Sequence, residues 1–299
     1  MNNIKSTFSI KDLENLTGIK AHTIRIWEKR YNLLEPERTD TNIRYYSLKN
    51  LQKLLNVSYL NNNGYKISKI ATLKNEKIST LVREIAENLD AKNHAINALK
   101  LSMLNFDQVL FYNTYESLAK EKSFKEIFFE TFIPLLTDIG LLWQTDTITP
   151  AHEHFITTLI RQKILINTEI YQSQNSKKDS RTFVLYLPDN EVHELGLMYL
   201  NFELISRGYH CIFLGQSVPI DSLIDVLNYN DRITFISYFT VKPDKENLLN
   251  YLKEFNEKLL IKPNTDLWIL GRMIQEIDLK KLPKQISTFK TIDHLVKEL

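Results

Sequence analysis

A short acidic and histidine-bearing segment, LPDNEVHELG, follows directly behind RTFVLYL, a run typical of a buried strand. Within it, Glu191 lies two positions before His193, and Gly196 lies three positions after that histidine. A neutral imidazole is a common metal ligand, and a nearby carboxylate can hold its second ring nitrogen. The segment is therefore either a surface loop that contains one histidine or a metal-ligating loop in which Glu191 orients His193.

A second group of polar residues follows a tryptophan in the segment WQTDTITPAHEHF. Nine residues separate Trp143 from the pair Glu153 and His154. Thr149 and Pro150 are typical of the residue before a helix and of its first position, so we expect the pair near the start of a helix. A large aromatic beside a few polar groups is typical of a ligand pocket, although each of these residues is also common in a core or at a surface.

Basic residues gather before residue 50, on and after the helical pattern AHTIRIWEKRYN. Residues 20–50 contain seven Lys or Arg and four Asp or Glu, a local net charge of +3 in a chain whose net charge is +2. The pattern follows a shorter helix that ends near Gly18, as in a helix-turn-helix, whose second helix enters the DNA major groove. The charge alone fits equally well a small helical hairpin with a solvated basic face.

The composition narrows the class of protein. With 299 residues, 43% of them hydrophobic and 25% charged, we expect a soluble protein of two or three domains. The single cysteine, Cys211, excludes an internal disulfide and a multi-cysteine metal site, and it favours a reducing compartment. We find neither a signal-peptide pattern nor an apolar run of about 18 residues, so we expect a cytoplasmic protein without a membrane partner. Neither a phosphate-binding glycine loop nor a Ser-His-Asp order is present, and we expect no enzyme activity.

The chain divides into three regions of different pattern. Short helical patterns dominate residues 1–75, longer amphipathic patterns dominate residues 76–172, and strand-like runs alternate with helices in residues 181–299. Five strands are expected in TFVLYL, YHCIFL, ITFISYF, DLWIL and QISTF, and the helices between them in HELGLMYLNFELISRG, PIDSLIDVLNYN and KENLLNYLKEFNEKL. We predict a multidomain chain: an all-α helix-turn-helix domain, a helical bundle, and an α/β doubly wound (flavodoxin-like) parallel sheet after a polar linker, QSQNSKKDS. Ligands of such sheets bind beyond the carboxyl ends of the strands, where Glu191 and His193 follow the first one.

The first region resembles the winged helix-turn-helix of MerR-type regulators. The matching features are SIKDLENLTGI, the run TIRIWEKRY, the PER of the wing, and the RYYS that leads into the next helix. The resemblance implies that double-stranded promoter DNA is a partner. It implies contacts from His22, Thr23 and Arg25 on the recognition helix and from Arg38, Arg44 and Tyr45 on the wing. We expect Trp27 and Tyr31 to pack in the core of this domain.

The later motifs, in this order behind such a module, resemble those of MerR-type regulators with a C-terminal cobalamin-binding module. EVHELG matches the E/D-x-H-x-x-G motif of the α/β domain of that family. The resemblance implies that His193 coordinates the cobalt of a corrinoid from below, with Glu191 on the other ring nitrogen. It also implies that Gly196 lets the nucleotide tail of the cofactor pass close to the backbone.

The same resemblance extends to the other cofactor positions. The tryptophan and the Glu-His pair match a helical cap domain, in which Trp143, Glu153 and His154 would line the upper face of the corrinoid. Ser237 and Gly271 match a later serine and glycine of the family, and we expect both to line the cofactor. Two departures lie beside them: Tyr238-Phe239 stands where the family has x-Leu, and Arg272 stands where it has a second glycine. We expect a side chain as long as Arg272 to crowd the path of the nucleotide tail.

Three functional hypotheses remain open at this point. The leading one is a sequence-specific DNA-binding transcriptional regulator that senses cobalamin, as adenosylcobalamin or methylcobalamin, with a light response as one form of that sensing. Cobalamin would then control assembly into a homodimer or homotetramer, and thereby operator binding. The alternatives are the same regulator with a cobalamin-like domain that is apo or binds another ligand or protein partner, and a corrinoid-carrier enzyme.

Overall fold

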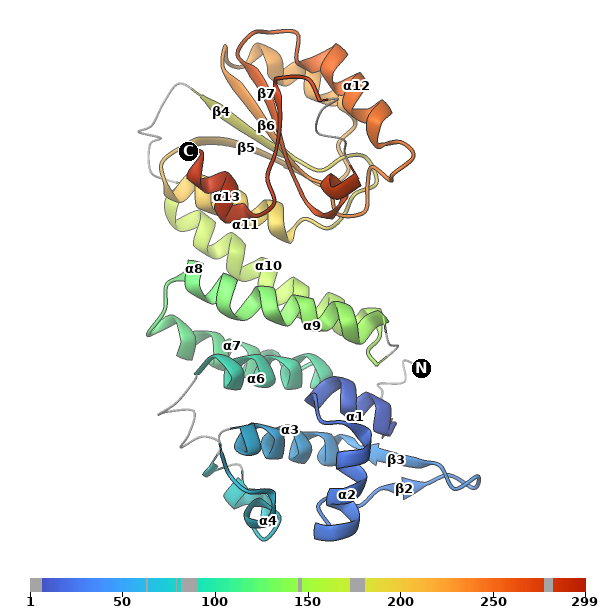
Figure 1. Ribbon diagram of the computed structural model, residues 1–299. Coiled ribbons are helices and arrows are strands. Elements are labelled where there is room, and N and C mark those ends of the chain that lie inside the picture. Colours follow the sequence, from blue (N-terminus) through green and yellow to red (C-terminus); the bar gives the residue numbers. More distant parts are fainter. Residues whose placement is uncertain are drawn as a thin grey trace. The chain divides into compact units, whose positions relative to one another are not determined.

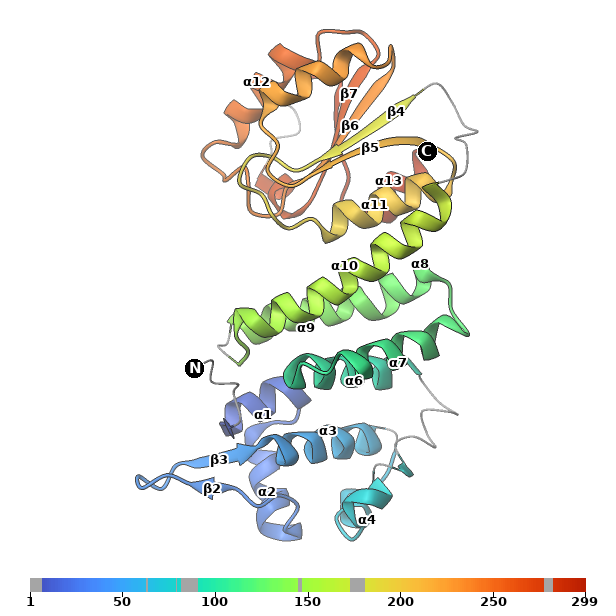
Figure 2. The ribbon, with the colours of Figure 1, turned by 180° about the vertical axis from the view of Figure 1, so that it is seen from behind.

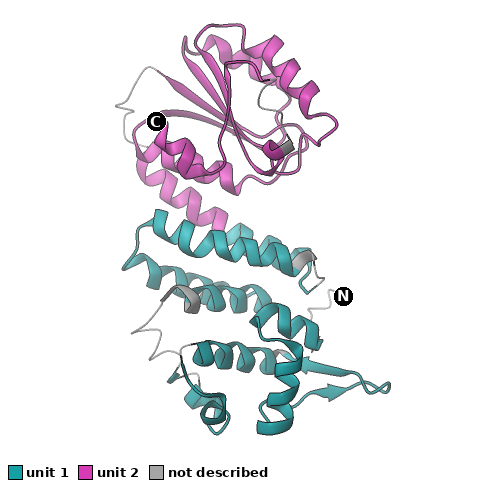
Figure 3. Ribbon diagram, in the orientation of Figure 1, with its two compact units in different colours: residues 1–159 teal, residues 160–299 magenta. Residues whose placement is uncertain are grey.

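A computed structural model describes residues 7–62, 64–78, 80–81, 91–144, 147–172, 181–276 and 282–299. The chain forms two compact units, residues 1–159 and 160–299 (Figure 3). The boundary between them falls within the long helix α10 (Pro150–Gln172), so the expected three domains at 1–75, 76–172 and 181–299 stay a prediction. Residues 173–180 of the expected polar linker lie outside the described residues.

The first unit begins with a helix-turn-helix. Helix α1 (Ile10–Thr17) starts at Ser9, whose hydroxyl accepts the N–H of Asp12, and it ends at Gly18 with a φ of 75°. A left-handed conformation at this position is what makes glycine the favoured residue there. Helices α2 (Ala21–Tyr31), α3 (Leu48–Asn62) and α4 (Ile67–Ile70) follow (Figure 1).

A small antiparallel sheet accompanies these helices. Its strands are β1 (Thr7–Phe8), β2 (Glu37–Arg38) and β3 (Arg44–Ser47), in the order β1-β3-β2. Strands of two to four residues are too short to show an alternating pattern, which is why the sequence predicted helices and a wing here but no sheet. The hairpin of β2 and β3 forms the wing.

The rest of the first unit is helical. It comprises α6 (Ala91–Asn105), α7 (Gln108–Ala119), α8 (Phe124–Ile127), the π-helical segment η1 (Phe128–Phe132), α9 (Ile133–Gln144) and the start of α10. The chain breaks between α6 and α7 at Phe106, which has a φ of 53°. Asp107 then caps the next helix by accepting the N–H of Leu110 at 2.9 Å. The Phe106 ring stacks on that of His152 at 4.8 Å, a tertiary contact that supports the break.

The second unit contains the predicted doubly wound sheet. Its five parallel strands are β4 (Thr182–Tyr186), β5 (His210–Gly215), β6 (Ile233–Tyr238), β7 (Thr265–Leu270) and β8 (Ile286–Thr288), in the order β5-β4-β6-β7-β8. Helices α11 (Leu195–Ser206) and α13 (Ile292–Lys297) cover one face, and α12 (Leu248–Leu259) and η2 (Ile220–Asn228) cover the other (Figures 1 and 2). A short 3₁₀ segment, η3 (Arg272–Glu276), follows β7.

The segment η2 is a 3₁₀-helix, whereas the sequence predicted an α-helix. Ile220, Leu223 and Leu227 are buried in the hydrophobic core on this face of the sheet, and Val226 packs against it.

The strand order creates one crevice at the carboxyl edge of the sheet. The chain leaves β4 through α11 toward β5 on one side, and it leaves β6 through α12 toward β7 on the other. Connections that depart in opposite directions open a gap between the neighbouring strands β4 and β6, and ligands of doubly wound sheets bind there. We call this gap the switch-point crevice. In the part of the chain that the structure describes, no helix is long and apolar enough to cross a membrane.

Candidate corrinoid site and DNA-binding module

The segment that leaves β4 is organised around the carboxylate of Glu191, which is only 1% exposed. Its Oε1 atom lies 2.6 Å from Nδ1 of His193, and it accepts the N–H of Val192 at 2.9 Å and of His193 at 3.0 Å. Its Oε2 atom accepts the N–H of Val241 at 2.6 Å and of Lys242 at 2.8 Å. One carboxylate therefore joins the segments that leave β4 and β6 on the two sides of the crevice.

The hydrogen bonds of Glu191 decide its charge and the tautomer of His193. Burial by itself would raise the pKa of Glu191, but the bonds from the His193 ring and from three backbone N–H groups outweigh it and lower the pKa to about 2. An ionised carboxylate only accepts hydrogen bonds, so Nδ1 of His193 is the donor. A neutral His193 ring then has its lone pair on Nε2, and the side chain is 51% exposed. Histidines that ligate metals commonly have this arrangement.

The segment after β5 stabilises the same loop, which connects β4 to α11, through hydrogen bonds of Ser217. The Ser217 hydroxyl donates to Oδ1 of Asp189 at 2.9 Å and accepts the N–H of Asn190 at 3.0 Å. The Ser217 N–H donates to the carbonyl of Glu191 at 3.2 Å. No local spacing in the sequence marks these residues, because their partners are distant along the chain.

A second ion pair fixes the other end of the loop. Arg161 of α10 lies 2.8 Å from the carboxylate of Glu194, the residue directly after His193. The Glu194 side chain is 11% exposed and that of Arg161 is 45% exposed, so the pair is partly shielded from water. Both residues belong to the second unit, and the sequence analysis pointed to neither.

Gly196 and Ser237 lie on opposite walls of the crevice. Ser237 is fully buried in β6, and its hydroxyl donates to the carbonyl of Tyr186 in β4 at 2.9 Å. Gly196 lies in the first turn of α11, and the ring of Tyr238 rests on it. A methyl group at Gly196 would lie 3.0 Å from Cε2 of Tyr238, which is closer than such contacts normally are.

Gly271 has a conformation and a setting that only glycine satisfies. Its φ is 106°, and a side-chain methyl group there would collide with the backbone of Phe239. Arg272, which was expected to crowd the path of the nucleotide tail, is exposed. The side chain that crowds Gly196 is Tyr238, not Arg272. The sequence signal for Tyr238 is its size at the position directly after Ser237.

The expected upper-face residues belong to the first unit. Trp143 falls in α9, and its side chain lies outside what the structure describes. Glu153 is half-buried and His154 is exposed, both near the start of α10 as predicted. His152 is buried, with Nδ1 at 2.9 Å from the Thr149 hydroxyl. A shared pocket for Trp143, Glu153 and His154 stays a prediction.

A cavity of about 670 Å³ lies elsewhere in the first unit. Its lining comes from α1, α3, α6 and α9 and includes an ion pair of Lys100 with Asp138 at 2.6 Å. It contains none of the predicted site residues whose side chains are described. It does not contribute to the crevice in the second unit.

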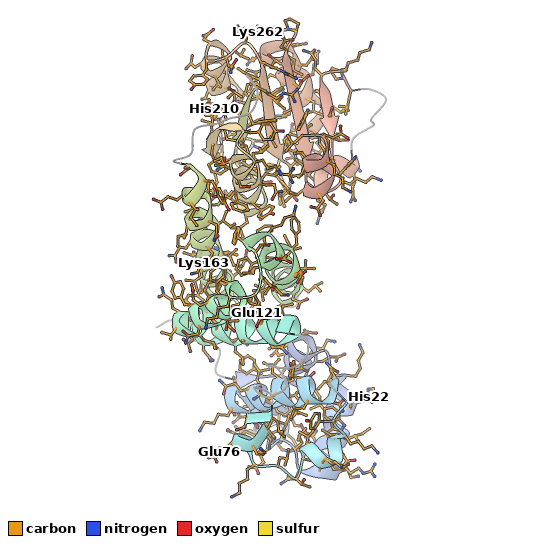
Figure 4. The ribbon with its side chains drawn as sticks, turned by 90° about the vertical axis from the view of Figure 1, so that its left-hand side faces the viewer. His22, Glu76, Glu121, Lys163, His210 and Lys262 are labelled. Carbon is orange, nitrogen blue, oxygen red and sulfur yellow. The ribbon has the colours of Figure 1, made fainter. Side chains whose placement is uncertain are left out.

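The predicted recognition residues lie at the surface of α2. His22 and Arg25 are exposed and Thr23 is half-buried, and Figure 4 shows His22 at the edge of the module. Trp27 packs in the core as expected, with 9% of its surface exposed. Tyr31 is only half-buried, because it lies at the last turn of α2 with the guanidinium of Arg30 above its ring.

The wing is held to α2 by one carboxylate. Glu28 accepts a hydrogen bond from the Tyr46 hydroxyl and lies 3.5 Å from Nε of Arg44. Across the hairpin, the Tyr45 hydroxyl donates to Glu37 at 2.8 Å. Arg44 and Tyr45 therefore stabilise the wing in addition to any contact with DNA.

Arg38 keeps the exposed position expected of a wing contact. Its guanidinium donates to Oδ1 of Asn42 at 2.6 Å, in the turn between β2 and β3. Its contact with DNA, like those of the other residues above, stays a prediction.

Two family models match these structural parts. The model of the MerR HTH family regulatory protein matches residues 8–77, which contain the small sheet and α1 to α4. The model of a B12 binding domain matches residues 95–166, within α6 to α10. The chain therefore combines a MerR-type helix-turn-helix domain with a B12-binding domain.

Curated proteins similar to the regulator are themselves transcription factors. The HTH-type transcriptional repressor CarH of Myxococcus xanthus is 28% identical over 224 residues, 73% of each chain. The repressor CarA of the same organism is 26% identical over 222 residues, 73% of the regulator and 71% of the relative. The regulator MlrA of Escherichia coli is 28% identical over 86 residues, 29% of the regulator and 31% of the relative.

A solved structure shows the same fold. The monomethylamine corrinoid protein of Methanosarcina barkeri matches with a TM-score of 0.56 at 12% identity, over 70% of the regulator and 98% of that chain. The expected fold class and the expected DNA-binding regulator with a cobalamin-binding domain are confirmed.

The side chains at the crevice fit a corrinoid. His193, as a neutral imidazole held by the ionised carboxylate of Glu191, would supply a nitrogen donor to its cobalt. Among the described residues there is no group of three or more His, Cys, Asp or Glu placed to hold a bare metal ion. The ring of Tyr238 on Gly196 opposes a bulky ligand in the crevice.

Replacing Arg25 with alanine is expected to weaken binding to promoter DNA about tenfold and to reduce the salt dependence of binding by roughly one counterion, because an exposed cation on α2 is lost. The measurement is fluorescence anisotropy over a range of salt concentrations, with DNA selected by the wild-type protein. Lys253→Ala removes the same charge from an exposed side chain of the second unit and is the matched control. Equal binding of both variants at all salt concentrations would remove Arg25 from the interface.

Proposed function

We propose that the regulator senses cobalamin at the switch-point crevice, with His193 as the axial ligand of cobalt. The observation that carries the proposal is the 2.6 Å hydrogen bond from Nδ1 of His193 to an ionised and buried carboxylate, at the edge of the sheet where such folds bind ligands. The cofactor is adenosylcobalamin or methylcobalamin. In this proposal the other cofactor-binding residues are Trp143, Glu153, His154, Glu191, Gly196, Ser237 and Gly271.

The output of this sensing is occupancy of promoter DNA in the cytoplasm, through His22, Thr23, Arg25, Arg38, Arg44 and Tyr45. A single small DNA-binding module with a local net charge of +3 rarely suffices for a specific site. Assembly into a homodimer or homotetramer joins several modules and raises the affinity through effective concentration. Cobalamin would therefore act by changing the state of assembly.

The mass of the protein in solution is expected to increase when adenosylcobalamin binds. Size-exclusion chromatography with light scattering, carried out in the dark with and without adenosylcobalamin, measures it. The same sample after illumination tests a light response. An unchanged mass in the presence of ligand that is shown spectroscopically to be bound would rule out control by assembly.

An absorbance titration of the full chain with hydroxocobalamin and adenosylcobalamin tests the sensing itself. Corrinoid that stays with the protein through gel filtration at a saturable ratio supports the proposal. The spectral change is expected to be small, because the His193 nitrogen would replace the benzimidazole nitrogen that ligates cobalt in free cobalamin. Absence of binding favours the second candidate, in which the cobalamin-like domain is apo or binds another ligand or a protein partner. The Tyr238 ring in the crevice is the observation that favours this candidate.

The third hypothesis, a corrinoid-carrier enzyme, has less support. A carrier of methyl groups needs no DNA-binding module, whereas residues 8–77 match one. The relatives CarH and CarA are named as transcriptional repressors.

A further inference from the structure

Tyr238 occupies the switch-point crevice through packing. It is the last residue of β6, and three atoms of its ring, Cε2, Cζ and Cδ2, would lie within 3.0 to 3.3 Å of a methyl group built on Gly196. The residue is half-buried, and this burial raises the pKa of its hydroxyl. Among the described residues, no hydrogen-bond partner holds that hydroxyl. The ring can therefore be displaced at the cost of its packing alone.

The walls around Tyr238 leave the ring as the adjustable element of the crevice. Glu191 ties the backbone of Val241 and Lys242 to the His193 segment. On the β7 side, the Gly271 backbone packs so closely on Phe239 that even one methyl group would collide. Backbone movement on either side would break these contacts, so a ligand that enters the crevice has to move the Tyr238 side chain.

The space in this crevice affects which corrinoids can bind, because cobalamin carries a nucleotide tail on its lower side. Cobalamin carries a nucleotide tail that ends in a dimethylbenzimidazole base, which is the lower ligand of cobalt in the free cofactor. If His193 takes that position, the base has to leave the cobalt and find room beside the protein. Cobinamide contains the same corrin and cobalt without the nucleotide and its base, so it makes no such demand.

We infer that Tyr238 is a specificity-determining residue that disfavours corrinoids with a nucleotide tail and leaves the binding of tail-less corrinoids unhindered. The inference rests on the proposed function, since it concerns a corrinoid whose cobalt binds His193. The Tyr238 ring fills the crevice, whereas a small residue at this position would leave it open. The ligand class is then an incomplete corrinoid, or a complete one bound with loss of affinity.

The test compares two ligands on the full chain and its variants. Wild type, Tyr238→Ala and Tyr238→Phe are titrated with hydroxocobalamin and with diaquacobinamide, and binding is followed by visible absorbance. Wild type is expected to bind cobinamide about 10- to 100-fold more tightly than cobalamin, the size expected for exposing one buried aromatic side chain. Tyr238→Ala should reduce this ratio to near one by improving cobalamin binding, whereas Tyr238→Phe retains the ring and should behave as wild type.

Two controls separate specificity from stability. Tyr229→Ala removes a tyrosine that is 62% exposed and should leave the ratio unchanged. Thermal unfolding checks the fold of each variant, and Tyr238→Val, which suits a strand better, replaces Tyr238→Ala if the latter does not fold.

The outcomes distinguish the inference from the function on which it rests. If wild type binds both corrinoids with equal affinity and the small variants do not change the ratio, the role of Tyr238 is overturned and cobalamin sensing stands. If neither corrinoid binds to wild type or to the small variants, the sensing of corrinoids fails, and the inference fails with it.

Discussion

The His193→Ala variant is expected to bind corrinoid roughly 100-fold more weakly than wild type or worse, because loss of a metal ligand should exceed the 10- to 100-fold typical of losing its hydrogen-bond partner. The corrinoid that remains bound should have nearly the spectrum of the free ligand, since no protein nitrogen reaches the cobalt. Cobinamide is the most informative ligand for this measurement. It has no base of its own, so any shift toward a nitrogen-ligated spectrum in wild type comes from the protein.

A second histidine provides the control for His193. His294 is exposed on α13, and its replacement by alanine should change neither affinity nor spectrum. Identical titration curves and spectra for wild type and His193→Ala would show that another group, or none, ligates the cobalt. Circular dichroism of both variants confirms that the α/β unit remains folded.

The Glu191→Gln variant is expected to lose about 2–4 kcal/mol of unfolding free energy as well as corrinoid affinity, because buried N–H groups lose their acceptor. The spacing of the motif alone indicates a smaller effect, since there Glu191 only orients the His193 ring. The structure adds two N–H donors on Oε2, from Val241 and Lys242. Both oxygens of Glu191 accept backbone N–H groups. The NH2 group of a glutamine at this position would therefore face N–H donors in either orientation of its amide. The measurement is urea unfolding at pH 7.

The same substitution should alter the dependence of stability on pH. The Glu191 pKa lies at about 2 in the folded chain and near 4.5 in the unfolded one. Its contribution, roughly 3 kcal/mol, is fully present above pH 4.5 and is lost as the pH falls from about 4.5 toward 2. Wild type should therefore lose more unfolding free energy between pH 5 and 3.5 than Glu191→Gln does. Glu257→Gln, at an exposed position of α12, is the matched control and should retain the pH dependence of wild type. Parallel curves for wild type and Glu191→Gln would contradict the low pKa of Glu191.

The local part of the site was determined by the sequence itself. Glu191 and His193 are two residues apart in one tight segment, so their contact depends on few torsion angles and was predicted correctly. The end of α1 at Gly18 was predicted for the same reason, because a helix that ends in a left-handed residue favours glycine at that position. Periodicity was sufficient for the parallel sheet, since strands buried on both faces are continuously apolar.

Only the tertiary structure decided what surrounds the histidine. The register of the parallel strands β4 and β6 brings their carboxyl ends together, and it thereby places the Val241 N–H on Glu191 and the Tyr238 ring on Gly196. No spacing along the chain encodes these contacts, because they arise when side chains from distant segments compete for one volume. The motif therefore determined that Glu191 holds the His193 ring through Nδ1, and packing decided how much space is left in the crevice.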